Sequence, residues 1–119
     1  MKTTIWLAAA AAACLAMPAS AHHSHAMFDH QKEVTISGTV MNFAYVNPHG
    51  SLDVAVEENG QMKKYWVEMS NLTQMVMRHI TPATFKKGDK VTVKMHPLKD
   101  GRPGGSYLLI TAADGKDYE

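Results

Sequence analysis

The sequence predicts a small all-β protein, an OB-like five-stranded antiparallel barrel with one short helix between its third and fourth strands. Apolar residues alternate with polar ones over residues 32–46, 52–56 and 62–69, and they alternate again from residue 91. Between these runs, near residue 75, the apolar spacing becomes helical. This order of elements, with a long first strand, is typical of an OB-type barrel, and a plain antiparallel sheet with one helix is the alternative.

The first predicted strand begins near Lys32 and ends at the NPHG turn, residues 47–50, because proline cannot donate a hydrogen bond to a sheet. Gly38 in its middle suggests a bend or bulge that lets one strand join both halves of a curled sheet. Alternation divides the strand into two faces. One face carries Val34, Ile36, Val40, Ala44 and Val46, and the other carries Thr35, Ser37, Thr39, Met41, Phe43 and Tyr45.

The next two strands form a predicted hairpin. Leu52, Val54 and Val56 alternate in the second strand, and Asn59-Gly60, a strong two-residue turn signal, leads into a third strand over residues 62–69. The apolar spacing then predicts a helix whose buried stripe is Leu72, Met75, Val76 and His79. Ser70 or Asn71 can cap its start, and Thr81-Pro82 ends it.

The last two predicted strands are separated by a loop rich in glycine and proline. Val91, Val93 and Met95 alternate after the turn at residues 87–89, and a final strand is centred on residues 107–111. Met75 and Met95 are expected in the core, where methionine commonly fills gaps.

The N-terminus has the features of a cleaved signal peptide. Lys2 precedes an uncharged stretch over residues 5–17, which is too short to cross a bilayer as a helix and is broken by Pro18. Ala19 and Ala21 supply the small residues before the cut, so residues 1–21 are expected to be removed. The alternative is lipidation of Cys14, which follows a poor lipobox. We therefore expect a periplasmic or secreted protein without a transmembrane span.

Removal of this leader leaves a nearly neutral chain without cysteine. The full chain has 12 basic and 11 acidic residues, and Lys2 and Cys14 are lost with the leader. Nucleic-acid binders usually carry a basic excess, so we expect no nucleic-acid partner. Residues 22–31 would form a histidine-rich arm and residues 32–119 the barrel domain.

Five segments occur in the order typical of a bacterial family of small exported proteins known only as a domain of unknown function. They are AHHSHAMFD, NPHG, YWVE at residues 65–68, KKGDKVTV and HPLKDG. The sequence resembles this family over the whole expected mature chain. The resemblance implies an exported barrel-like domain and no particular reaction. His79-Ile80 departs from the Gly-Trp pair that we expect there, which puts any role of that tryptophan in doubt.

A histidine cluster follows the expected cleavage site and is the strongest chemical signal in the sequence. Cleavage after Ala21 would give His22 both a free α-amine and an imidazole, a chelate that favours copper. His23 and His25 add imidazoles that would project to the same side of an extended segment. His49, in the NPHG turn, could complete a site if the arm reached it. We predict that copper or another transition metal binds His22, His23, His25 and His49, and a solvated arm is the alternative.

Other polar residues give weaker signals. We expect Glu68 to face solvent or to pair with Lys64, and the alternative is a buried carboxylate beside Trp66 with a raised pKa. We expect His96 to be a rim residue at a strand end. No catalytic sequence motif is present, so we predict no enzyme activity. The alternative to metal binding is an envelope module that binds a protein, peptide or saccharide through Phe43, Tyr45 and Trp66, unless these aromatic residues complete the core.

Overall fold

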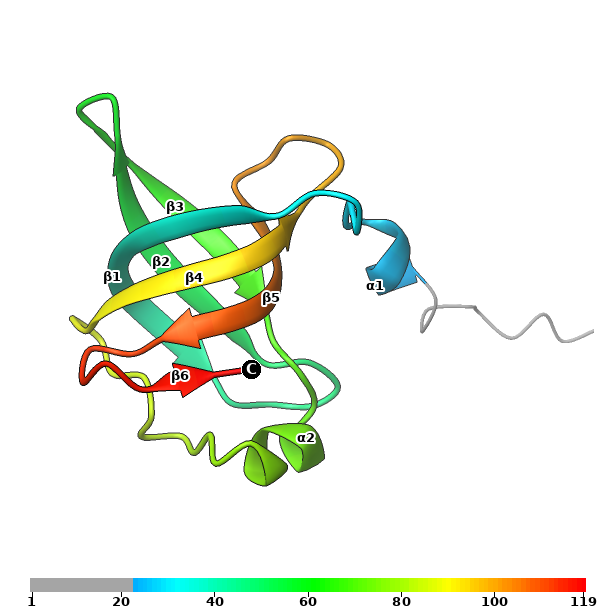
Figure 1. Cartoon of the computed structure of the whole chain (residues 1–119), viewed down its shortest axis with the longest axis vertical. Helices are drawn as coiled ribbons and strands as arrows, with labels where there is room; N and C mark the ends of the chain where they lie inside the picture. The colour runs from blue at the N-terminus through cyan, green and yellow to red at the C-terminus, as the bar shows by residue number, and fades with distance from the viewer. Residues whose placement is uncertain (1–22) are drawn as a thin grey trace, which may run out of the picture.

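The computed structural model describes residues 23–119 and confirms the OB-like barrel with its short helix (Figure 1). The strands are β1 (Val34–Ala44), β2 (Ser51–Glu58), β3 (Gln61–Glu68), β4 (Lys90–Pro97), β5 (Gly104–Thr111) and the unexpected short β6 (Asp117–Tyr118). The helices are α1 (His23–Ala26) and α2 (Leu72–Met77). Within these residues, no helix is long and apolar enough to cross a membrane.

Five of the strands close into a barrel, and β6 continues the sheet from β5. The hydrogen-bonded order is β3-β2-β1-β4-β5-β6, and a further pairing between β3 and β5 closes the ring. That closing pair is parallel, whereas the other pairs are antiparallel. Parallel strands need a long connection, and the segment with α2 and β4 supplies it.

Strand β1 belongs to both halves of the barrel, as expected from Gly38. Residues 34–39 pair with β4 and residues 39–44 pair with β2. A Cβ atom at Gly38 would lie 2.2 Å from the Ala55 carbonyl oxygen, so only glycine allows this approach.

The two-face assignment of this first strand is wrong beyond Val40. A register shift between Val40 and Asn42 inserts an extra residue and reverses the alternation. Phe43 therefore packs against the core. Val46, expected on the apolar face, is 50% exposed, whereas Met41 is 44% exposed, in agreement with its expected place on the polar face.

The hairpin between β2 and β3 is confirmed. Asn59 and Gly60 have φ values of 50° and 79°, and two consecutive positive φ angles are what a type I′ turn requires. Leu52, Val54 and Val56 are buried, as their alternation predicts.

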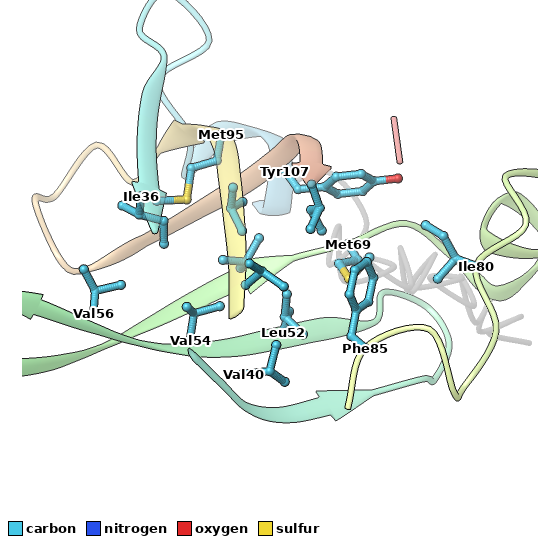
Figure 2. Packing of buried hydrophobic residues seen from close by; sticks show 14 of the residues in the cluster. Ile36, Val40, Leu52, Val54, Val56, Met69, Ile80, Phe85, Met95 and Tyr107 are labelled. Carbon is cyan, nitrogen blue, oxygen red and sulfur yellow. The ribbon is translucent and has the colours of Figure 1, made fainter. Parts of the chain in front are cut away.

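The core fills the barrel and continues under its α2 end. Figure 2 shows Ile36 and Met95 at one end, and Met69, Phe85 and Ile80 toward the helical end. Met75 and Met95 are fully buried, as expected.

Helix α2 is shorter than the predicted apolar stripe. The Asn71 side chain caps it by accepting a hydrogen bond from the Gln74 amide at 2.8 Å, which confirms one of the two expected caps. Met75 is buried, but Val76 is 64% exposed, so the four-residue stripe is wrong. The helix ends at Met77, and Ile80 rather than a further helical turn fills the barrel end.

The departure at His79-Ile80 has a structural explanation. His79 has a φ of 60°, in the left-handed region that favours glycine at the end of a helix. Ile80 is fully buried, and its carbonyl accepts a hydrogen bond from the Tyr45 hydroxyl at 3.0 Å. Ile80 thus fills a core position at the place where we expected tryptophan.

Candidate metal centre

The chain preceding β1 is attached to the barrel through Phe28. This side chain is 1% exposed and stacks on Trp66, with ring centroids 6.3 Å apart and planes at 16°. Phe28 also forms an isolated antiparallel bridge with Leu98. The Asp29 amide donates to the Pro97 carbonyl at 2.8 Å, and the Lys99 amide donates to the Met27 carbonyl at 2.9 Å. The end of the arm is therefore part of the folded domain.

The first described residues form the helical turn α1, which Figure 1 shows beside the β4 and β5 end of the barrel. The extended geometry expected for His23 and His25 is therefore wrong. His25 is exposed, and its ring centroid lies 6.2 Å from that of His30. His22 lies outside the described residues.

His49 is held beside the end of β3 by the NPHG turn. The Gly50 amide donates to the Ser70 carbonyl at 3.0 Å, and the Met69 amide donates to the Gly50 carbonyl at 2.8 Å. The His49 Nδ1 atom lies 3.3 Å from both the Met69 carbonyl oxygen and the Glu68 Oε1 atom. Carbonyl and carboxylate oxygens only accept, so Nδ1 carries a proton, and in the neutral ring Nε2 keeps its lone pair.

Glu68 is the buried acidic residue of this region. Only 8% of it is exposed, and it pairs with His49, so the expected solvent position and Lys64 partner are both wrong. Burial raises the pKa of the Glu68 carboxyl, and the nearby charges of His49 and then His25 oppose that rise. His25, from the arm, therefore lies within electrostatic reach of the His49–Glu68 pair.

We expect Glu68→Gln to stabilise the protein at neutral pH. Because the folded-state pKa is raised, the folded chain holds this proton more tightly, and stability falls as pH rises through that pKa. The advantage of the glutamine variant over the wild type should therefore be small at pH 4 and larger at pH 7. Urea unfolding at both pH values measures it, with exposed Glu57→Gln as the control. If the stability advantage of Glu68→Gln is smaller at pH 7 than at pH 4, the result would contradict a pKa of Glu68 raised by burial.

Two further histidines meet at the junction of arm and barrel. The rings of His30 and His96 lie edge to face, with centroids 5.0 Å apart. His30 Nε2 lies 3.0 Å from the His25 carbonyl oxygen, and His96 Nδ1 lies 2.8 Å from the Lys32 carbonyl oxygen. His96 is half-buried and contacts both the His30 ring and the Lys32 carbonyl, whereas the rim position that we expected requires neither contact.

The histidine face, as we name it, consists of His25, His30, His49, Glu68 and His96. Glu68 is the register partner of Ser106, and Ser106 is the partner of His96, so Glu68 and His96 lie in one row across β3, β5 and β4, with β5 between them. Among residues 23–119, no three His, Cys, Asp or Glu side chains lie close enough to hold an ion as they stand. A metal would therefore need a side chain of the arm to move or a ligand from residues before His23.

A separate apolar hollow lies on the other side of Phe28. It has a volume of about 430 Å³ and is lined by Met27, Lys64, Trp66, Leu98, Arg102 and Pro103. Of the three aromatic residues expected as contacts, Phe43 and Tyr45 pack against the core, and Trp66 lines this hollow.

A family model matches residues 10–107, most of the chain. The protein belongs to DUF6152, a family of unknown function. The match spans the region before α1 and the barrel as far as the first half of β5, so the histidine face lies within the part of the chain that the DUF6152 model covers. The search of curated proteins finds no match.

Among solved structures, this DUF6152 protein is similar to Rim1, a mitochondrial single-stranded DNA-binding protein from S. cerevisiae. The TM-score is 0.53 at 17% identity, and the similarity covers 68% of this chain and 92% of that one. Such a low identity supports the shared fold only.

The sequence signals for Glu68, His30 and His96 were weak for a physical reason. Glu68 and His96 each stand alone in their segments, and His30 stands apart from the other arm histidines; the docked arm brings His30 beside His96. Alternation could have placed Glu68 on the outer face with Trp66, because residues two apart on a strand share a face. Nothing in the sequence pairs residues 28–30 with residues 96–98.

Proposed function

We propose that this protein is a small exported, non-enzymatic protein that binds copper or another late transition metal ion. His22, His23 and His25 of the arm are the proposed ligands, with His49 as the completing one. The observation that carries the proposal is the attachment of the arm to the barrel, where the His25 ring lies 6.2 Å from that of His30 and the His30 ring lies 5.0 Å from that of His96 in β4. The attached arm thus supports the proposal that its histidines bind an ion together with a barrel residue.

The chemistry of His49 supports this role. Histidines that bind metals usually donate the other ring N–H to a carboxylate or backbone carbonyl, which fixes the tautomer. His49 has both acceptors at Nδ1, and 41% of its side chain is exposed. Nitrogen donors suit late first-row ions, and copper has the highest affinity in the divalent series.

Copper titration of the chain beginning at His22 tests the proposal. One added N-terminal residue is expected to weaken Cu(II) binding because it removes the amine from the His22 chelate. His23→Ala/His25→Ala and His49→Ala are each expected to weaken binding by at least about tenfold, or 1.4 kcal/mol. A competing chelator of known affinity gives the constants, and intact mass of the exported protein fixes the true first residue.

His79→Gly is the matched control. His79 is an exposed histidine outside the histidine face, and glycine accepts its φ of 60°. This variant should bind copper as the wild type does. If the wild type and all of these variants bind copper equally, with only micromolar affinity, the result would contradict a dedicated site.

That contrary outcome would favour the second candidate, an envelope module that binds a protein, peptide or saccharide without metal. The hollow at Trp66 is the specific observation behind it, because it presents an aromatic face between Lys64 and Arg102. The name of Rim1 refers to single-stranded DNA, but the near-neutral charge of residues 22–119 argues against such a partner here.

A further inference from the structure

We infer that His30 and His96 form a second site for a divalent late transition metal ion, at the junction of the arm and the barrel. This inference rests on the proposed metal-binding function and adds two ligands to it. In it, the ion binds His30 through Nδ1 and His96 through Nε2.

The hydrogen bonds of the two rings decide which nitrogen is free. His30 Nε2 faces the His25 carbonyl at 3.0 Å, and His96 Nδ1 faces the Lys32 carbonyl at 2.8 Å. A carbonyl oxygen only accepts, so each of these nitrogens carries a proton. The opposite nitrogen of each neutral ring then keeps its lone pair. Each ring therefore has one nitrogen free to bind a metal, while the other donates a hydrogen bond to a backbone carbonyl, as metal-binding histidines usually do.

The separation of the rings fits a shared ion. With metal–nitrogen bonds of about 2.0–2.1 Å and a tetrahedral angle, two imidazole centroids lie about 5 Å apart. The centroids of His30 and His96 are 5.0 Å apart. The two side chains thus already lie at the separation that a shared ion requires.

The backbone holds the pair in this arrangement. Phe28 and Leu98 form the antiparallel bridge, and His30 and His96 each lie two residues from it, in opposite directions along the chain. The Asp29 amide is bonded to the Pro97 carbonyl between them, and the Lys32 amide closes the turn on the Asp29 carbonyl at 3.1 Å. His96 belongs to β4 itself. A pair supported in this way loses little freedom when an ion binds.

The site is separate from that of His49. Strand β5 lies between β4, which carries His96, and β3, which carries Glu68. Two strand spacings of about 4.8 Å place these backbones about 10 Å apart. Among residues 23–119, no third His, Cys, Asp or Glu joins either pair into a three-ligand group. Water would complete the coordination at His30 and His96.

Nitrogen NMR of the chain beginning at His22, titrated with Zn(II), tests the inference. We expect the 15N signals of His30 Nδ1 and His96 Nε2 to shift together, while His79 does not respond. His96→Ala should abolish the response of His30 and weaken Zn(II) binding at this pair by at least about tenfold. His79→Gly, the matched control, should leave both shifts unchanged.

A single variant separates this inference from the proposed function. It combines one added N-terminal residue with His23→Ala and His25→Ala. We expect its His30 and His96 nitrogens still to respond to Zn(II), although the N-terminal chelate is gone. Loss of the response in that variant would show one shared site and overturn the second. Coordination of His30 through Nε2, or a His30 response that survives His96→Ala, would also overturn it.

Discussion

Replacing Phe28 with alanine is expected to lower the free energy of unfolding by about 3 kcal/mol, because a fully buried aromatic ring is lost. Phe28 is 1% exposed, covers Trp66 and joins the chain to Leu98. Its loss should also free the arm. Copper affinity should then fall, since a loose arm presents its histidines to His49 at a lower effective concentration.

Urea unfolding and copper titration of the Phe28→Ala protein measure both effects. Met62→Ala is the control, because Met62 is a large apolar side chain that is 65% exposed, and its loss should change stability by less than about 0.5 kcal/mol. Weaker folding with unchanged copper affinity would show that ion binding does not depend on the docked arm.

A methyl group at Gly105 should lower the free energy of unfolding by at least about 3 kcal/mol, at the upper end of the usual cost of overpacking. The Cβ atom of Gly105→Ala would lie 2.2 Å from the His96 carbonyl oxygen and 2.9 Å from the Met95 sulfur. The methionine can move, but the carbonyl belongs to the β4 backbone. Strands β4 and β5 would have to separate where β5 also pairs with β3.

Gly88→Ala provides the comparison for this effect. Gly88 has a φ of 95° and no atom near its missing Cβ, so alanine there meets backbone strain of about 1–2 kcal/mol without a clash. Thermal or urea unfolding of the two variants should therefore rank Gly105→Ala as clearly the less stable. Equal stabilities would mean that the barrel relaxes around residue 105.

Local patterns in the sequence predicted most of the barrel. Val54, Val93 and the Asn59-Gly60 turn were assigned correctly because their signals lie within a few neighbouring residues. The errors follow from features without a local signal. One extra residue near Met41 reversed the faces of β1, and the short α2 left Val76 exposed.

The candidate site was less predictable than the fold. The sequence singled out His25 and His49, and the structure relates both to Glu68, which the sequence placed in solvent. His30 and His96 are 66 residues apart and meet through the Phe28–Leu98 bridge. Contacts of such separation depend on barrel closure, which no short window of sequence contains.

The double pairing of β1 also bears on the order of folding. Ser37 of β1 contacts Thr92 of β4, 55 positions along the chain, and contacts of such high sequence separation make folding slow. The Phe28–Leu98 bridge extends this pairing, so it forms only after the two strands have met. The unfolded polypeptide cannot hold His30 beside His96, and an ion that needs both would shift the equilibrium toward the native state by mass action.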